Sequence, residues 1–333
     1  MTETTGDVVD IGIPVPNITP PATPEAIRRV PQAAEQLGFH SVWLGDHIVR
    51  PIGPDQPAYF KESSRYTWDL YEPMVSAGFV AANTTTVKIG FGVLVLPYRN
   101  PVVTAKAVAS LDQLSNGRVI LGVGSGYWPQ EFQALNMPQR HAGLRTEEYI
   151  ELFRSPWKSE KPEFHGEFVE ISDVLFKPSP QQEDLPIWLG GMSDSAIRRA
   201  VRIADGWHVP RSTVSGMAYQ MRRLREVAAA EKRDLSRFVV SNRPEVRFAR
   251  KASKPDLAQD FRSGDPAPVA SPIVGPPEYV AERLAAFGEL GVSHLVIDLH
   301  EGGTLKEVLG AMETFAESVM PHLTTSSSAS WDS

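Results

Sequence analysis

The sequence of 333 residues contains no cysteine. Disulfide bonds, thiolate metal ligands and a cysteine nucleophile are therefore excluded. The chain also lacks an apolar run long enough to cross a membrane, and its first residues, MTETTGDVVD, hold neither the basic region nor the apolar run of a signal peptide. We therefore expect a cytoplasmic protein with no membrane partner.

Basic residues are in the minority. Acidic residues outnumber lysine and arginine by 40 to 33, which gives a formal charge of −7. Such a surface is unsuited to phosphate backbones, so we do not expect a nucleic-acid partner. The sequence has no HExxH motif and no carboxylate cluster with metal-ligand spacing, so it implies no metal.

Short apolar strands that end in glycine, proline or a polar residue recur along the chain, and most are followed by a helical pattern. Repeated strand, loop and helix units predict a parallel sheet that binds ligands at the carboxyl ends of its strands. The predicted strands are Val8–Pro14, Ser41–Leu44, Val87–Leu96, Val119–Val123, Ile187–Leu189, Gly206–Val209, Phe238–Phe248 and Ser293–Asp298. The predicted helices are Thr23–Leu37, Trp68–Ala82, Val102–Leu114, His141–Trp157, Ser193–Ile203, Ser215–Glu231, Pro277–Leu290 and Thr304–Leu323.

Eight strands alternating with eight helices predict an α/β fold, a (β/α)8 TIM barrel. Insertions are expected after strands two, four and seven: a long loop through Tyr66, a hairpin at Phe164–Phe176, and a mobile excursion at Lys251–Pro277. We expect one domain over residues 1–323 and a disordered, serine-rich tail over 324–333. An open doubly wound sheet is the rival fold, but the chain offers only GxGxG, a weak match to a dinucleotide motif.

Two glycine-containing strand ends are candidate ligand contacts. In VILGVGSGYW (Val119–Trp128), glycines let the backbone approach a ligand where a Cβ would collide. In PIWLGGMS (Pro186–Ser193), residues Gly190, Gly191 and Met192 precede a helix start, where free N–H groups favour a phosphate and Ser193 could add its hydroxyl. The alternative for this second segment is a plain helix cap.

Asp46 and His47 follow the second strand, where side chains project into the mouth of a barrel. Histidine exchanges protons near neutral pH and is therefore a candidate acid or base, while the aspartate could bind a polar ligand edge. The alternative is a loop-capping aspartate beside a structural histidine.

Four segments resemble the luciferase-like monooxygenase superfamily, and specifically its branch of probable coenzyme F420-dependent oxidoreductases. The resemblance extends from Gly12 to about Leu323. Its motifs are GFHSVWLGDH (Gly38–His47), KIGFGVLVLPYRNPVVTAKAVASLDQLSNGRVILGVGSGYW (Lys88–Trp128), PIWLGGMSDSAIRRAVRIADGWH (Pro186–His208) and GPPEYVAERLAAFGELGVSHLVI (Gly275–Ile297).

The resemblance assigns roles to residues at the barrel mouth. It implies that Asp46 and His47 lie around a deazaflavin ring, and that a non-prolyl cis peptide at Gly92–Val93 backs that ring. The same resemblance implies that the cofactor also contacts Gly124, Ser125 and Gly126, and it favours phosphate binding by Gly190, Gly191, Met192 and Ser193.

Other mouth residues receive weaker assignments. Tyr127 and Trp128 are expected to line the substrate side, although sugar-phosphate dehydrogenase relatives have a glutamate where this chain has Tyr127. Arg99 is expected to contact the cofactor tail or an anionic substrate, and His141 with Arg145 to reach the tail. Arg140 is a less certain candidate for the same role. For His208 the favoured interpretation is a packed barrel histidine.

The resulting hypothesis is an F420-dependent oxidoreductase that transfers a hydride between deazaflavin C5 and a small organic substrate. His47 is the first candidate proton source and Tyr127 the second. The alternatives are an FMN-dependent two-component monooxygenase and a non-catalytic flavin- or ligand-binding barrel. An F420-reducing or flavin-reducing system and a second copy of the chain, forming a homodimer, are the expected partners.

Overall fold

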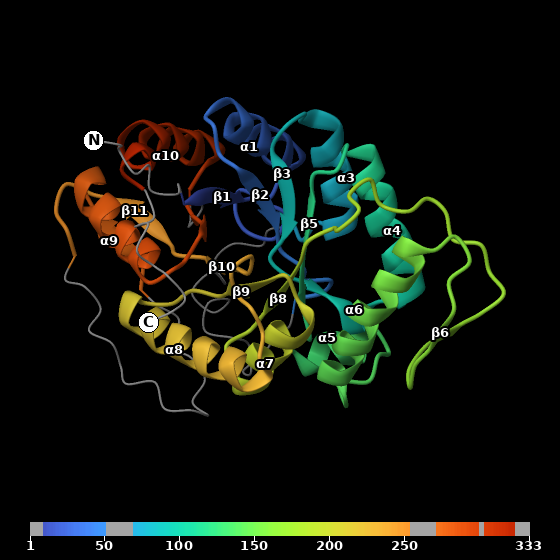
Figure 1. Ribbon diagram of the computed structural model, residues 1–333. Coiled ribbons are helices and arrows are strands. Elements are labelled where there is room, and N and C mark those ends of the chain that lie inside the picture. The colour runs from blue at the N-terminus through green and yellow to red at the C-terminus, as the bar shows by residue number, and fades with distance from the viewer. Residues whose placement is uncertain (1–8, 51–68, 254–270, 300–302, 324–333) are drawn as a thin grey trace, which may run out of the picture.

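The barrel has eight parallel strands in a closed ring (Figure 1). The structure, a computed structural model, describes residues 9–50, 69–253, 271–299 and 303–323. Around the ring the strands are β1 (Asp10–Pro14), β2 (Ser41–Leu44), β3 (Lys88–Phe91), β5 (Val119–Gly124), β8 (Ile187–Gly190), β9 (Gly206–Val209), β10 (Val239–Asn242) and β13 (His294–Val296). β3 pairs with β5 and β13 with β1, so every barrel strand has two neighbours and the predicted barrel is confirmed.

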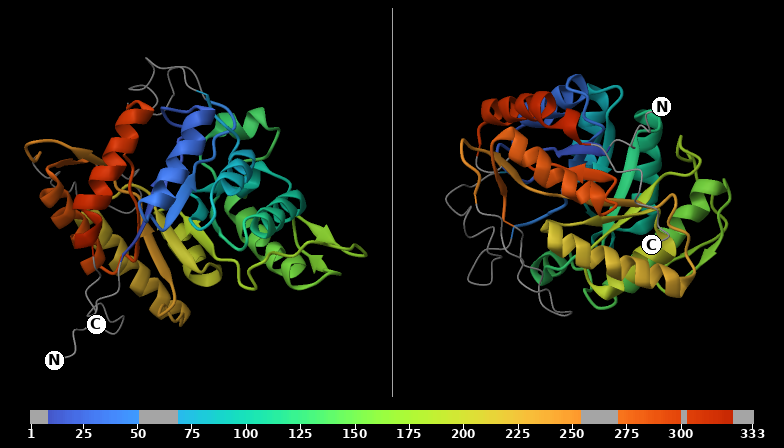
Figure 2. Two further views of the ribbon diagram at one scale, coloured as in Figure 1. Left: turned by 90° about the horizontal axis from the view of Figure 1, so that it is seen from above. Right: turned by 60° about the vertical axis from the view of Figure 1, so that its left-hand side comes forward.

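Among the described residues, eight helices follow the barrel strands and form the outer layer (Figure 2). They are α1 (Pro24–Gln36), α3 (Pro73–Asn83), α4 (Pro101–Leu114), α6 (Ala142–Lys158), α7 (Asp194–Ile203), α8 (Val214–Glu231), α9 (Pro277–Glu289) and α10 (Leu305–Ser318). Two helices begin within a residue of the predicted position because a side chain caps each one. The Thr23 side chain accepts from the N–H of Ala26 at the start of α1, and the Asn100 side chain accepts from those of Val102 and Val103 at the start of α4. Within the described ranges no helix is long and apolar enough to cross a membrane.

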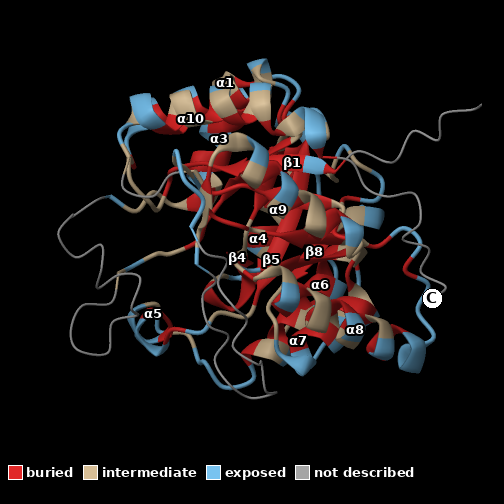
Figure 3. Ribbon diagram, turned by 90° about the vertical axis from the view of Figure 1, so that its left-hand side faces the viewer, coloured by how far each residue is buried: buried red, intermediate tan, exposed pale blue. Residues whose placement is uncertain are grey.

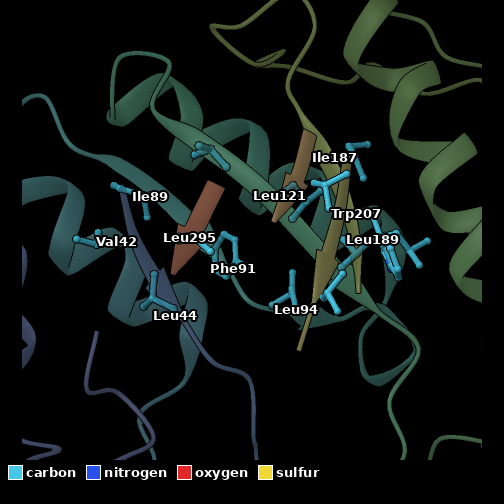
Figure 4. Close-up of a cluster of buried hydrophobic side chains, with 14 of the residues drawn as sticks. Val42, Leu44, Ile89, Phe91, Leu94, Leu121, Ile187, Leu189, Trp207 and Leu295 are labelled. Carbon is cyan, nitrogen blue, oxygen red and sulfur yellow. The ribbon is translucent and has the colours of Figure 1, made fainter. Parts of the chain in front are cut away.

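The main core lies between strands and helices, because alternate strand residues face outward. Buried strands are enclosed by helices whose outer faces are exposed (Figure 3). Figure 4 shows ten of the core side chains: Val42, Leu44, Ile89, Phe91, Leu94, Leu121, Ile187, Leu189, Trp207 and Leu295. Each such burial contributes about 1.5 to 3 kcal/mol, so this layer is the main source of stability.

Aromatic rings fill the barrel interior on the alternate strand positions. Trp43 stacks on Trp188 at 5.2 Å and on His208 at 5.0 Å, and the His294 ring lies edge-on to Trp43 at 5.2 Å. Several glycines make room for these rings. A Cβ on Gly12, Gly90 or Gly206 would lie 2.6 to 2.7 Å from one of the two indoles.

A chain of hydrogen bonds crosses the same interior. Trp43 Nε1 donates to Ser41 Oγ at 2.8 Å, and Ser41 Oγ lies 2.8 Å from His294 Nε2. His294 Nδ1 and His208 Nδ1 each lie 3.1 Å from Ser241 Oγ. Burial lowers the pKa of His208 to about 3, with Arg243 adding to the effect, and burial holds the pKa of His294 well below its usual range. Both histidines are therefore neutral in the folded protein.

Two predicted strands are divided. The predicted strand Val87–Leu96 ends as β3 at Phe91 and resumes as β4 (Leu94–Val95), which runs into a 3-10 turn, Leu96–Tyr98. Phe238–Phe248 is also wrong as one strand, because Pro244 lacks the N–H that a continuous ladder needs. Its second half, β11 (Val246–Phe248), pairs outside the barrel with β12 (Ile273–Gly275).

The insertions are partly as expected. The predicted hairpin is confirmed, with β6 (Phe164–His165) antiparallel to β7 (Glu170–Ile171). The excursion at Lys251–Pro277 includes the short strand β12, and its residues 254–270 lie outside the described ranges. Most of the loop through Tyr66 and the tail 324–333 also lie outside them. A short helix, α5 (Pro129–Ala134), lies between β5 and α6, and α10 ends earlier than predicted, with a 3-10 turn at Met320–His322.

The neutral interior histidines predict a loss of stability on mild acidification. In the unfolded chain each titrates near 6.5, so between pH 6.5 and about 3 the unfolded state binds more protons than the folded state. The free energy of unfolding should fall as pH falls, by about 1.4 kcal/mol per pH unit for each histidine well below pH 6.5. Urea unfolding at pH 7 and pH 5.5 measures this loss. This loss of unfolding free energy should be smaller in His208→Gln and unchanged in His165→Gln, which replaces an exposed histidine. Equal losses in the wild type and both variants would show that the buried histidines are not its cause.

Candidate functional site

A bulge between β3 and β4 forms the floor of the barrel mouth. The Gly92–Val93 peptide bond is cis, the geometry that the resemblance implied. The Val93 side chain inserts between two neighbouring strands: a Cβ on Gly124 would lie 2.6 Å from Val93 Cγ2, and one on Gly190 would lie 2.7 Å from Val93 Cγ1. These two glycines therefore make room for the bulge itself.

Asp46 is buried beside the bulge and fixes its far end. Its carboxylate accepts two hydrogen bonds from Arg99, at 2.5 and 2.9 Å, and one from the Val95 N–H at 2.8 Å. Arg99 also donates to Glu72 at 3.1 Å. Burial raises the pKa of Asp46, and Arg99 opposes that rise. The pair ties the loop after β2 to the segment after β4.

His47 is oriented by a carboxylate that the sequence interpretation missed. Its Nδ1 lies 3.0 Å from Glu131 Oε2, and the side chain of Glu131 is only 1% exposed. Glu131 also accepts from the Ile48 N–H at 2.9 Å and from the Tyr98 hydroxyl at 3.1 Å. Burial and the charge of Glu131 both raise the pKa of Tyr98, so its phenol stays a donor. Because a carboxylate only accepts, His47 donates from Nδ1 and turns Nε2 away from Glu131.

Two aromatic residues cover His47. Trp128 is buried and stacks on the His47 ring at 4.2 Å, whereas Tyr127 is 60% exposed and lies edge-on to it at 6.5 Å. Gly126 just before them has φ of +74°, a conformation that favours glycine. Ser125 accepts from the Thr146 hydroxyl at 3.1 Å. The segment after β5 thus brings Tyr127 to His47, with its ring toward solvent.

The start of α7 lies at the carboxyl end of β8. Ser193 caps the helix by accepting from the Ala196 N–H at 3.2 Å, and Gly191, at φ of +120°, accepts from the Trp207 indole at 2.7 Å. Met192 is half-buried and Ser193 exposed. This geometry is the helix cap named as the alternative; it engages the Ala196 N–H, so an anion could bind only at the N–H groups of Asp194 and Ser195 in the first turn.

Arginines surround two buried carboxylates at the ends of β9, β10 and β13. Arg211 forms ion pairs with Glu245 and Asp298, Arg243 pairs with Asp298 at 2.9 Å, and Arg247 pairs with Glu245 at 2.9 Å. A cavity of about 490 Å³ adjoins this cluster. Its size is that of a small-molecule site.

Comparison with known proteins decides the family. The family model described as luciferase-like monooxygenase matches residues 11–254. The chain belongs to this family. A curated relative, the uncharacterized protein Rv0940c of Mycobacterium tuberculosis H37Rv, is 38% identical over 180 residues, which is 53% of this chain and 62% of that protein. The chain thus spans less than two thirds of the curated relatives that it matches at this level.

Relatives of this luciferase-like chain differ in their named cofactors. The F420-dependent glucose-6-phosphate dehydrogenase of Amycolatopsis mediterranei is 35% identical over 187 residues, 52% of this chain and 50% of that protein. The FMNH(2)-dependent dimethylsulfone monooxygenase of Pseudomonas putida is 26% identical over 311 residues and 80% of both chains. The structure of the coenzyme F420-dependent tetrahydromethanopterin reductase from Methanopyrus kandleri has the same fold, with a TM-score of 0.74 at 20% identity, covering 96% of this chain and 100% of that one.

Several residues that the sequence suggested for the cofactor tail in this luciferase-like chain have other partners. Arg99 is held by Asp46 and Glu72, and Arg145 donates to the carbonyls of Pro138 and Arg140 while its guanidinium faces the Phe168 ring. The Arg140 guanidinium is hydrogen-bonded to the His141 ring at 2.9 Å. These arginines thus have protein partners, their expected contacts with a cofactor tail stay predictions, and His208 is packed in the barrel as predicted.

The fit of Val93 between two glycines predicts a steric penalty. Gly124→Ala should lower the free energy of unfolding by about 1 to 3 kcal/mol, because the new methyl group overlaps Val93. The matched control is Gly78→Ala in α3, where a Cβ meets nothing within 4 Å and helix propensity favours alanine. Combining Gly124→Ala with Val93→Ala should recover part of the loss in urea unfolding. If Gly124→Ala and Gly78→Ala were equally stable, glycine at position 124 would not be needed for the bulge.

The Asp46–Arg99 pair predicts a larger penalty. Arg99→Gln should lower the free energy of unfolding by about 3 to 5 kcal/mol at neutral pH, because it leaves a buried carboxylate unpaired. Without Arg99, burial raises the pKa of Asp46 unopposed, so the deficit should shrink as pH falls and the carboxyl takes up a proton. Arg29→Gln, which breaks the exposed pair with Glu25, should cost less than about 1 kcal/mol. A deficit that grows on acidification would contradict this account.

Proposed function

We propose that the protein is an F420-dependent oxidoreductase that transfers a hydride between deazaflavin C5 and a small organic substrate. The observation that carries the proposal is the His47–Glu131 pair beside the Gly92–Val93 bulge: a half-buried histidine oriented by a buried carboxylate at the mouth of the barrel. Active sites of this barrel class lie at that end. The matches to the F420-dependent relatives support the choice of cofactor.

The residues at the mouth fit a planar ring with an anionic tail. The bulge offers an apolar surface at Val93, and His208 Nε2 lies 3.1 Å from where a Cβ on Gly92 would be. The α7 start, with Gly190, Gly191, Met192 and Ser193, would hold the phosphate by N–H groups and the Ser193 hydroxyl. When bound, the deazaflavin would supply hydride chemistry at C5.

The chain's own residues would position the substrate and handle the proton. Because Glu131 fixes the Nδ1 proton of His47, Nε2 is the atom that gives or takes a proton on the substrate side. Tyr127, edge-on to His47, is the second candidate for this role. The buried indole of Trp128 excludes water from one face of the histidine.

Partner assignments belong to the same proposal. Electrons would come from an F420-reducing system. A homodimer would cover the exposed apolar side chains of α3 and α4, since such side chains otherwise face water. These side chains are Val75, Phe79, Val103 and Leu114.

An FMN-dependent two-component monooxygenase is the second candidate. It is favoured by the dimethylsulfone monooxygenase, which aligns over 80% of both chains. It would require a flavin-reducing partner and molecular oxygen, so oxygen dependence separates it from hydride transfer.

Anaerobic titration with oxidised F420 and, separately, with FMN tests the proposal. We expect F420 to quench protein fluorescence with micromolar or tighter affinity and FMN to bind more weakly. Preferential FMN binding with oxygen-dependent product formation would favour the monooxygenase. Binding of neither would favour a non-catalytic barrel.

His47→Gln then separates binding from proton transfer. In a screen with reduced F420 it should lower turnover by about 10²- to 10⁴-fold, the usual contribution of a general acid or base, while F420 affinity changes little. His165→Gln, which replaces an exposed histidine in the β6–β7 hairpin, is the matched control, and Tyr127→Phe tests the second candidate separately. Unchanged turnover in His47→Gln would remove His47 from the mechanism.

A further inference from the structure

His208 ends a buried chain of hydrogen bonds at the bulge. The residue is 4% exposed, and its ring is parallel to Trp43. Its Nδ1 is engaged by Ser241, whereas its Nε2 makes no hydrogen bond to any residue that the structure describes. A Cβ on Gly92 would lie 3.1 Å from Nε2, so this atom reaches the floor of the mouth because position 92 is glycine.

The donor-to-acceptor direction of this series of hydrogen bonds follows from its first member, Trp43. An indole N–H only donates, so Ser41 Oγ must accept from Trp43. The Ser41 hydroxyl then has His294 Nε2 as its acceptor, which places the His294 proton on Nδ1. That N–H donates to Ser241 Oγ, and the Ser241 hydroxyl donates to His208 Nδ1. A neutral His208 therefore carries its proton on Nε2.

The opposite direction leaves a buried donor unpaired. If His208 donated from Nδ1, the Ser241 hydroxyl would donate to His294 Nδ1, and His294 would donate from Nε2 to Ser41. Ser41 Oγ would then accept twice and its own proton would have no acceptor among the described residues, although the side chain is fully buried. In the first direction the one donor of the chain without a described partner is the His208 Nε2–H at the floor of the mouth. The opposite direction leaves the deeply buried Ser41 hydroxyl unpaired as well as the bare Nε2, at a cost of about 1 to 3 kcal/mol by general estimates, so the first direction is favoured.

We propose that His208 presents a neutral Nε2–H group at the Gly92–Val93 bulge as a hydrogen-bond donor to an acceptor atom of the bound ring, and that Trp43 fixes this polarity from within the barrel. The identity of the ring as a deazaflavin rests on the proposed function. The polarity is a property of the ligand-free protein. Trp43, Ser41, His294 and Ser241 are positioning residues, since they act only through His208.

Histidine-selective ¹⁵N NMR on the full-length, ligand-free protein tests the polarity, with His208→Gln used for assignment. We expect the Nε2–H tautomer of His208 alone, unchanged between pH 8 and pH 5.5. Trp43→Phe should give a mixture of the two tautomers, because Ser41 then no longer has an obligatory donor. The matched control is Trp188→Phe, which removes an indole from the same stack but no bond of the chain. A Nδ1–H tautomer in the wild type, or equal mixing in both variants, would overturn the polarity.

Adding F420, and FMN in a second sample, tests the donor role. A bound ring should shift the His208 Nε2 signal and slow exchange of its proton, and Gly92→Ala should weaken binding by roughly tenfold with the tautomer unchanged, as expected for loss of one hydrogen bond. A ring that binds without perturbing His208 would refute the contact while the proposed function stands. If neither ring binds, the proposed function and the donor role both fail, and the tautomer result shows separately whether the polarity argument holds.

Discussion

The structure depends on the burial of Trp43 inside the barrel. An indole at this position leaves no room for side chains on the two neighbouring strands, β1 and β3, which is why Gly12 and Gly90 lie against it. Its N–H needs a buried acceptor, and Ser41 supplies one. Its face stacks on His208, so the same side chain sets the packing, the polarity and the position of the last interior ring below the mouth.

The bulge connects this interior to the mouth. Gly92 passes over His208, and Val93 occupies the space that two neighbouring strands leave by having glycine at 124 and 190. On its other side Asp46 accepts from the N–H of Val95, and Arg99 holds that carboxylate. The bulge at the floor of the mouth and the loops at its rim are thus connected. The Asp46–Arg99 ion pair, whose residues the sequence suggested as ligand contacts, holds this floor in place.

The sequence predicted the barrel and the location of the mouth because both depend on local patterns: strand ends, helix caps and glycines. Asp46 and His47 directly follow a strand, so their end of the barrel could be inferred. Glu131 could not be, since it meets His47 across 84 residues of sequence through a short helix after β5. The partner of Arg99 could not be inferred for the same reason: a cation after a strand gives no indication that a buried aspartate 53 residues away pairs with it. The break at Pro244 could have been read locally.

Two histidines near the mouth differ in their surroundings. His47 is partly exposed and its Nδ1 lies 3.0 Å from the buried Glu131 carboxylate, so under the proposed function it is the histidine that would exchange a proton with the substrate. His208 is buried and its pKa is lowered to about 3, so it is neutral near neutral pH and would act there as a hydrogen-bond donor only. Under the proposed function, hydride transfer from an alcohol to a bound ring would build negative charge on the ring beside the His208 donor, while His47 would take the proton that the alcohol loses.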